Sequence, residues 1–355
     1  MGGVFRYVNP PSIYWGPGSL QRLSEELDRL GVRRPFLVIT RSLADDDGIV
    51  DQLRHAAGRA LVGEPRLIGQ HAPEREVASA VEAAKKAEPD GVLSLGGGSP
   101  IDAAKIVAFE LGAVPHVALP TTLSVAELAP SAGVTDASGQ KGGQRDPLLT
   151  PKAVIYDGEL AVRTPLDLWL STGIRALDHA VETILDPGEH PYSDTLALEG
   201  IRRLFASLPS AKAQPMDAGV RTENQVAAWL SYSLPQVAGG LSHMLGKQIG
   251  SPFGIPHGVT SCLLLPHVIR YRARTQADQA ALLAPAMGVG SPGDCSEELA
   301  SAAADAVYDL IARLGLPRHL SAYHLTDDQL RAAALPLSNQ RYPLDDLVAI
   351  YRAAA

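Results

Sequence analysis

The chain has 355 residues, of which 46% are hydrophobic and 20% are charged, which is typical of a globular protein with about two domains. The net charge of −8 and the lack of a lysine or arginine run argue against a nucleic-acid partner. Two isolated cysteines exclude a disulfide framework, and no apolar stretch approaches the roughly 18 residues that span a bilayer. We therefore expect a cytoplasmic protein without a membrane partner.

The first half of the chain alternates short apolar runs with helical patterns. Strands are predicted at residues 36–40, 92–95 and 117–119, and helices at 74–88 and from 101 onward. The first of these helices carries one apolar stripe, made of Val77, Ala80, Val81 and Ala84. Because this alternation is typical of βαβ units, residues 1–157 are predicted to form an α/β domain with a parallel sheet.

A cluster of glycines separates the predicted strand at 92–95 from the helix that follows. Glycines let backbone N–H groups approach a phosphate, and the start of a helix favours negative charge. Pro100 suits the first helical position, and Ser99 with Asp102 is predicted to form a capping pair. A well-capped turn without a ligand explains these residues equally well.

Two threonines tilt the balance towards a nucleotide, because they follow the next predicted strand and so lie at the same edge of the sheet. The predicted cofactor-binding residues at this edge are Gly96, Gly97, Gly98, Ser99, Asp102, Thr121 and Thr122.

The second half of the chain is rich in alanine and leucine and lacks strand signals. Helices are predicted at about 172–186, 192–208, 221–250, 257–272, 296–314 and 340–353. Residues 158–355 are therefore predicted to form an all-α domain. Since no repeat or flexible linker separates the halves, we expect them to pack with a cleft between them.

One helix of this second half places four polar residues on a single face: Arg175, Asp178, His179 and Glu182. Together with two later histidines they suggest a site for a divalent cation, which three histidines and a carboxylate usually form. However, the position one turn before His179 holds Arg175, and a guanidinium cannot bind a cation. Three interpretations stay open: a metal site, a pocket in which a fixed positive charge replaces the metal, or a structural pair between Arg175 and Asp178 or Glu182.

Five segments of the chain resemble the iron-containing (group III) alcohol dehydrogenases. They are residues 97–105, 120–122, 173–182, 240–243 and 256–258, and the spacing of 14 between His243 and His257 is similar too. The resemblance implies a dehydroquinate synthase-like architecture, with a dinucleotide-binding α/β domain, a helical domain and a nicotinamide cofactor in the cleft. The N-terminal segment, residues 5–15, resembles the family's strand-forming N-terminus, which implies a homodimer.

Within that family, residues 141–160 and 265–267 look most like the maleylacetate reductases. Those enzymes similarly keep the histidines, lack the metal-binding aspartate and reduce a dicarboxylic oxo acid with NAD(P)H. In this chain Arg175 stands in place of that aspartate, and Lys247 stands where the wider family has a further histidine. Residues 125–127, Val-Ala-Glu, replace the family's Gly-Ser-Glu.

The cofactor is expected to be NADPH or NADH. Dehydrogenases that prefer NADH often place an acid after the second strand, where it binds the ribose hydroxyls. This chain has Thr40 and Arg41 at that place, so we expect a preference for the 2′-phosphate of NADPH.

The predicted function is the metal-independent reduction of a carboxylated, maleylacetate-like oxo acid by hydride transfer. Arg175 would bind a substrate carboxylate or polarise the carbonyl oxygen. His243 or His257 would deliver the proton, and Lys247 would hold a substrate carboxylate or serve as an acid. Glu182 is expected either to pack within its helix bundle or to support His179.

Two alternatives remain. The histidines would hold Fe or Zn in a metal-dependent alcohol dehydrogenase, with the ligands His179, His243 and His257. Or the chain is a repurposed biosynthetic dehydrogenase acting on a peptide or secondary metabolite, or a cofactor-binding protein without turnover.

Overall fold

The computed structural model describes residues 10–45, 48–137, 139, 141–188, 190–232, 240–291 and 293–355. These residues form two compact units. The α/β unit comprises residues 10–165 with 214–226, and the helical unit comprises residues 166–213 with 227–355. The predicted boundary at 157 follows the last strand directly, whereas the α/β unit continues to residue 165 and also takes in a segment of the second half.

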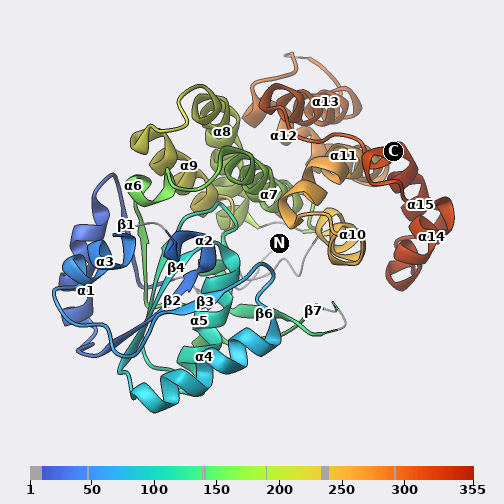
Figure 1. The fold of residues 1–355 in the computed structure, drawn as a ribbon. Coiled ribbons are helices and arrows are strands. Elements are labelled where there is room, and N and C mark those ends of the chain that lie inside the picture. The colour runs from blue at the N-terminus through green and yellow to red at the C-terminus, as the bar shows by residue number, and fades with distance from the viewer. Residues whose placement is uncertain are drawn as a thin grey trace. The chain divides into compact units, whose positions relative to one another are not determined.

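A parallel six-stranded sheet forms the centre of the α/β unit, with the strand order β1-β8-β5-β4-β2-β3 (Figure 1). The strands are β1 (Ser12–Trp15), β2 (Pro35–Thr40), β3 (Arg66–Ile68), β4 (Gly91–Gly96), β5 (His116–Pro120) and β8 (Ala153–Tyr156). The predicted parallel sheet is confirmed, and the three predicted strands are β2, β4 and β5. The alternation misses β3 and β8 because they are only three and four residues long.

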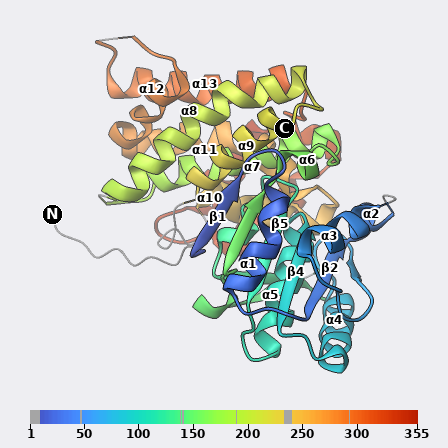
Figure 2. The ribbon, with the colours of Figure 1, turned by 90° about the vertical axis from the view of Figure 1, so that its left-hand side faces the viewer.

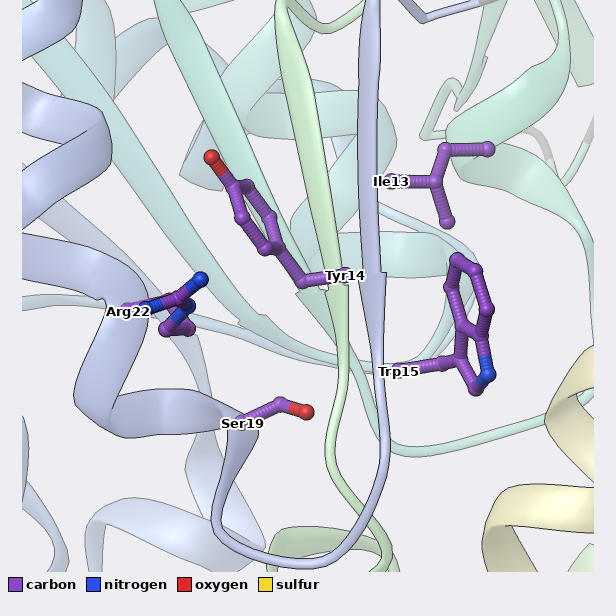
Figure 3. Close-up of a pocket in the computed structure, with 5 residues that line it drawn as sticks. All are labelled: Ile13, Tyr14, Trp15, Ser19 and Arg22. Carbon is purple, nitrogen blue, oxygen red and sulfur yellow. The ribbon is translucent and has the colours of Figure 1, made fainter.

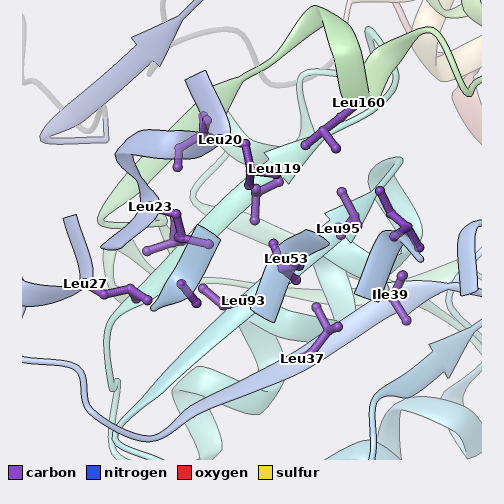
Figure 4. Packing of buried hydrophobic residues seen from close by; sticks show 14 of the residues in the cluster. Leu20, Leu23, Leu27, Leu37, Ile39, Leu53, Leu93, Leu95, Leu119 and Leu160 are labelled. Carbon is purple, nitrogen blue, oxygen red and sulfur yellow. The ribbon is translucent and has the colours of Figure 1, made fainter. Parts of the chain in front are cut away.

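Helices cover both faces of this sheet. On β2, Leu37 and Ile39 pack with the helices α1 (Leu23–Arg29) and α3 (Ile49–Ala57), as part of the cluster in Figure 4. Phe36 and Val38 point to the other face. There they pack with α4 (Glu74–Ala87) and α5 (Gly98–Glu110). Because successive side chains of a strand alternate between faces, burial on both sides requires the continuous apolar run seen in the sequence. The predicted stripe of α4 is confirmed as its buried face.

The remaining elements of the α/β unit are short. A separate antiparallel hairpin pairs two five-residue strands, β6 (Ser131–Thr135) and β7 (Lys141–Arg145). The others are η1 (Ser19–Arg22), α2 (Arg41–Ala44), η2 (Ala126–Leu128), η3 (Pro147–Leu149) and α6 (Gly158–Ala161).

Long helices build the helical unit, as predicted. They are α7 (Leu166–Ile184), α8 (Pro191–Ala213), α10 (Leu241–Ile249), α11 (His257–Ala281), α12 (Leu283–Met287), α13 (Ser296–Leu314), α14 (Asp327–Ala334) and α15 (Leu344–Ala353), with the short turns η4 (Ser251–Phe253), η5 (Leu320–Tyr323) and η6 (Leu335–Leu337). Helix α9 (Ala218–Leu230) begins in the α/β unit and ends in the helical unit. None of the helices in the described ranges is long and apolar enough to cross a membrane.

The single helix predicted at 221–250 is wrong. Helix α9 ends at Leu230 and α10 starts at Leu241, after Gly240 in an extended conformation with φ −66° and ψ −178°. The sequence between them contains Pro235, Gly239 and Gly240, and proline and glycine are the poorest helix formers. The alanine- and leucine-rich flanks hid this break. Residues 233–239 lie outside the described ranges.

Strand β1 lies at the edge of the sheet (Figure 2). A hollow of about 220 Å³ lies beside it (Figure 3). It is lined by Ile13, Tyr14, Trp15, Ser19 and Arg22. No predicted site residue lines it, so it is neither the predicted cofactor site nor the predicted substrate site. The Trp15 side chain is 58% exposed at this edge.

Candidate active site

The glycine cluster forms a tight turn between β4 and α5. Gly96 has a φ of +140°, which side chains rarely adopt, and a Cβ there would lie 2.7 Å from Cγ of Pro100 and 3.0 Å from Cβ of Thr40. Only glycine therefore fits this position. The contact also places Thr40, the last residue of β2, directly beside the turn.

The predicted capping pair at this turn is wrong. Helix α5 starts at Gly98 with Gly97 as its N-cap, so Ser99 and Pro100 already belong to its first turn. Proline is tolerated there because the first N–H groups of a helix have no intrahelical acceptor. The N-cap, Gly97, has no side chain that could accept a hydrogen bond, so the backbone N–H groups of this first turn have no side-chain cap. A phosphate can accept these hydrogen bonds.

The chain after β5 forms the second wall of this turn. The N–H of Thr121 donates to the carbonyl of Gly96 at 2.9 Å. A Cβ on Gly97 would lie 3.0 Å from Cγ2 of Thr122, and one on Gly98 would lie 3.3 Å from Oγ of Ser124. The two loops thus approach so closely that larger residues would fill the cradle between them. This geometry fits the phosphates of a dinucleotide.

Two polar side chains form hydrogen bonds with the backbone of this second wall, the chain after β5. Thr164 donates its hydroxyl to the carbonyl of Thr121 at 2.5 Å, and the buried Gln225 donates Nε2 to the carbonyl of Pro120 at 2.9 Å. The sequence analysis missed both. Gln225 belongs to the 214–226 segment, and no local pattern shows that this segment joins the α/β unit.

Asp102 and Lys105 contact a neighbouring loop. The Asp102 carboxylate accepts the N–H of Gly133 at 3.0 Å and lies 3.5 Å from Nζ of Lys105. The buried Lys105 ammonium donates to three backbone carbonyls, at 2.5 to 2.8 Å, on Ala126, Ala129 and Ser131. Asp102, predicted to bind the cofactor, thus holds residues 126–133 in place, together with a lysine to which the sequence analysis gave no role.

Glu127 lies buried in the same loop and accepts a hydrogen bond of 2.8 Å from the hydroxyl of Tyr156. Burial raises the pKa of Glu127 to about 7. The folded chain therefore holds a proton there between the ordinary carboxyl pKa and about 7, whereas the unfolded chain releases it. The stability that this proton brings is present at low pH and is lost as the pH rises through about 7.

We expect Glu127→Gln to remove this pH dependence. We compare the free energy of unfolding of the variant with that of the natural chain. The difference, variant minus natural chain, should rise by up to about 3 kcal/mol between about pH 5 and about pH 8. Urea unfolding followed by circular dichroism at both pH values measures it. Glu82→Gln, an exposed change on α4, is the control, and parallel pH profiles for all three chains would contradict the assignment.

The cation predicted at the ribose end of the cofactor site lies at the surface. Arg41 begins α2 directly after Thr40, and its guanidinium forms an ion pair with Glu76 at 3.1 Å. The Arg41 side chain is 60% exposed. Since exposed ion pairs contribute only about 0–1 kcal/mol, a phosphate can compete with Glu76 for this guanidinium.

In the helical unit, the three predicted histidines lie together although they come from three helices. His179 lies on α7, His243 on α10, and His257 at the start of α11. The rings of His179 and His243 are 5.8 Å apart between centroids, and those of His243 and His257 are 5.2 Å apart. Tyr232, which the sequence analysis missed, packs edge-on against His179 at 4.9 Å.

Arg175 is buried beside this group and forms a structural pair, as the third interpretation expected. Its Nη1 donates to Oδ2 of Asp178 at 2.9 Å and to Oγ of Ser261 at 3.0 Å. Only 3% of its side chain is exposed. Nη2 is buried and has no hydrogen-bond partner among the described residues. Of the two terminal nitrogens of the guanidinium, Nη1 is thus engaged inside the protein and Nη2 is not.

Glu182 contacts the backbone of His243. Its Oε1 accepts the backbone N–H of His243 at 3.1 Å, and a Cβ on Gly240 would lie 2.3 Å from its Cδ. The carboxyl group of α7 therefore caps the first turn of α10, which has no side-chain cap of its own. Burial raises the pKa of Glu182 well above its ordinary value, with a further contribution from Asp178.

The charges around the histidines do not suit a divalent cation. Burial lowers the pKa of His179 well below its ordinary value, and the positive charges of Arg175 and the exposed Lys247 lower it further. Among the residues that the structure describes, no group of three or more His, Cys, Asp or Glu is placed to hold a metal. The nearby guanidinium would repel a cation. Arg175 thus places a fixed positive charge beside the histidines, which disfavours a divalent cation there.

A parallel α/β unit with a glycine-lined phosphate cradle, joined to a helical unit with clustered histidines, defines the class of two-unit dinucleotide-dependent oxidoreductases. Comparison with known families agrees. The iron-containing alcohol dehydrogenase model matches residues 10–158, and the C-terminal model of the Fe-containing alcohol dehydrogenase family matches residues 169–353. The chain belongs to the iron-containing alcohol dehydrogenase family, and it is an NAD(P)H-dependent dehydrogenase or reductase.

Its relatives include maleylacetate reductases. Those of Rhizobium sp. strain MTP-10005 and Burkholderia cepacia are 32% and 31% identical, over 93% and 94% of this chain and 90% of each relative. The crystal structure of maleylacetate reductase from Agrobacterium tumefaciens matches with a TM-score of 0.88 and 29% identity, over 100% of this chain and 98% of that one. Sulfoacetaldehyde reductase from Bifidobacterium kashiwanohense, in complex with NAD+, shares the fold at 24% identity and a TM-score of 0.87, over 100% of this chain and 99% of that one. The predicted resemblance is thus confirmed.

Proposed function

We propose that this protein reduces a carboxylated oxo acid of the maleylacetate type with NADPH or NADH, and that it does so without a metal. The observation that carries the proposal is the buried Arg175 beside three histidines, where a cationic side chain takes the place of a cation-binding one. The similarity to maleylacetate reductases supports the substrate class.

The α/β unit would hold the dinucleotide. Gly97, Gly98 and Ser99 offer the N–H groups of the α5 start to its phosphates, and Thr121 and Thr122 form the opposite wall. When bound, the nicotinamide supplies the hydride. The chain's own contribution here is to orient the cofactor, because Thr164 and Gln225 fix the threonine loop at two carbonyls.

The helical unit would bind the anionic substrate and supply the proton. Nη2 of Arg175 can donate to a carboxylate or to the carbonyl oxygen that becomes negative during reduction. Because Nη1 already donates to Asp178 and Ser261, this contact would be made through Nη2. Burial lowers the pKa of His179 and so disfavours its protonated form, and we therefore assign proton delivery to His243 or His257.

NADPH oxidation by the purified chain tests this function. We expect turnover of maleylacetate, slower turnover of an uncharged aldehyde of similar size, and no loss of rate after treatment with a chelator. Loss of activity on chelation, restored by Fe or Zn, would show the metal-dependent alcohol dehydrogenase instead. Cofactor binding without turnover of either substrate class would favour a repurposed member of the family.

We further propose that NADPH is preferred over NADH, because Arg41 stands at the carboxyl end of β2 beside Thr40 and the glycine turn. Arg41→Ala should raise the KM for NADPH by about 10-fold, since a charge-assisted contact contributes about 1.5–3 kcal/mol, and should leave that for NADH unchanged. Initial rates with both cofactors measure the ratio. Arg54→Ala, which removes an exposed arginine from α3 in the same unit, is the control.

A homodimer is also proposed. Strand β1 lies at the edge of the sheet and exposes Trp15, and an edge strand is a natural pairing surface. Sedimentation velocity should show a dimer that Trp15→Glu dissociates, whereas Leu148→Glu, a change at another exposed apolar residue of the unit, should leave it intact. A monomeric natural chain would contradict the proposal.

A further inference from the structure

We infer that Asp178 is a positioning residue that joins the three histidine-bearing helices at one carboxylate oxygen, with Arg175 as its counter-charge. The inference rests on the proposed function in one respect, namely that the histidines act in catalysis. The hydrogen bonds from which it is argued do not depend on any substrate.

A single oxygen, Oδ2 of Asp178, accepts three hydrogen bonds from three helices. Arg175 of α7 donates at 2.9 Å, Ser242 of α10 at 3.0 Å, and Ser261 of α11 at 2.6 Å. These are the three helices that carry His179, His243 and His257. The carboxylate therefore holds together the three elements on which the spacing of the histidine rings depends.

Each donor also lies close to its histidine along the chain. Arg175 precedes His179 by one helical turn, Ser242 precedes His243 directly, and Ser261 follows His257 by one turn. A displacement of any of these donors thus moves the neighbouring imidazole with it.

Burial makes this junction sensitive to the loss of either partner. The Asp178 side chain is 0% exposed, and a buried carboxylate is costly unless it is paired and hydrogen-bonded. Arg175 supplies the opposite charge and donates to the Ser261 hydroxyl as well, which in turn donates to Asp178. The three side chains form a closed network in which every member depends on the others.

Glu182 adds a second contact between α7 and α10, because it accepts the N–H of His243. The first turn of α10 is therefore held at a hydroxyl by Asp178 and at the backbone by Glu182. This double contact, and not a metal, would keep the imidazole of His243 in register with that of His179.

The kinetic test compares Asp178→Ala, Asp178→Asn, Ser242→Ala and Ser261→Ala in the full chain. Because the cofactor cradle belongs to the α/β unit, Asp178→Ala should lower kcat by about 100-fold and leave the KM for NADPH within about two-fold. Asp178→Asn, which keeps the acceptor oxygen, should recover part of the loss, and each serine variant should lose a few-fold. Asp309→Asn, an exposed change on α13, is the control. A kcat that is unchanged in all four variants would overturn the inference. A rise in the KM for NADPH as large as the fall in kcat would overturn it too.

A second measurement needs neither cofactor nor turnover. Urea unfolding of Arg175→Met, Asp178→Asn and the double variant forms a double-mutant cycle. We expect Arg175→Met to lower the midpoint most, because it leaves a buried carboxylate unpaired, and the double variant to be more stable than Arg175→Met alone. Additive effects would overturn the pairing. This result stands even if the natural chain reduces no oxo acid, so the failure of the inference and that of the proposed function are distinguishable.

Discussion

Replacement of Arg175 by methionine is expected to abolish most of the reductase activity and to destabilise the chain. Methionine keeps an unbranched apolar stem but removes the whole guanidinium, and with it both the donor to the substrate and the partner of Asp178. Loss of a positioned donor to a developing oxyanion costs about 100- to 1000-fold in kcat. Breaking a buried ion pair from one side costs about 3–5 kcal/mol of stability.

Steady-state kinetics with an oxo dicarboxylate and urea unfolding measure the two effects separately. Arg202→Met on α8, where the arginine is exposed and paired with Glu199, is the matched control. A variant that unfolds more easily but keeps its kcat in the folded state would limit Arg175 to its structural role and remove it from the catalytic set.

The related change Arg175→Asp tests the relation to metal-dependent enzymes. It places a carboxylate one turn before His179 and removes the nearby positive charge, so reduction of the oxo acid should be lost. Metal analysis of the purified variant should then show Zn or Fe bound at a higher ratio than in the natural chain. Unchanged activity in the presence of chelator would contradict the proposed role of this residue.

Replacement of Gly96 by alanine is expected to disrupt the cofactor cradle. The new Cβ would lie 2.7 Å from Pro100 and 3.0 Å from Thr40, at a φ of +140° that alanine rarely adopts. We expect the affinity for NADPH to fall by about 100-fold, equivalent to about 3 kcal/mol. Fluorescence titration of NADPH measures it.

Gly112→Ala provides the control for backbone strain alone. Gly112 has a φ of +86° in the same unit, but a Cβ there meets no atom within 4 Å. It should cost about 1–2 kcal/mol of stability and leave NADPH binding unchanged. Equal NADPH affinity in both variants would show that the glycine turn does not hold the cofactor.

Much of the fold follows from local patterns. The β2, β4 and β5 runs are apolar on both faces because helices cover both sides of the sheet, and the α4 stripe marks its buried face directly. The start of α5 and the break before α10 are predicted wrongly. Both depend on glycines, whose conformational freedom makes a turn possible without stating where it begins.

The candidate site divides in the same way. The residue types of Arg175, His179, His243 and His257 are visible in the sequence, and the structure brings them together. The roles of Ser242 and Ser261 are not visible, since a serine has no periodicity that distinguishes a hydrogen-bond donor from a small packing residue. Their only signal is their position beside a histidine.

Local patterns in the sequence specify the α/β and helical halves, the glycine turn and the family, because these depend on periodicity and on residues close together in the chain. The partner of Arg175, the loop that Lys105 holds and the place of residues 214–226 in the α/β unit become visible in the folded chain alone. Apolar periodicity specifies which face of an element is buried. It does not specify which distant donor meets a buried charge, and that choice depends on how the helices pack.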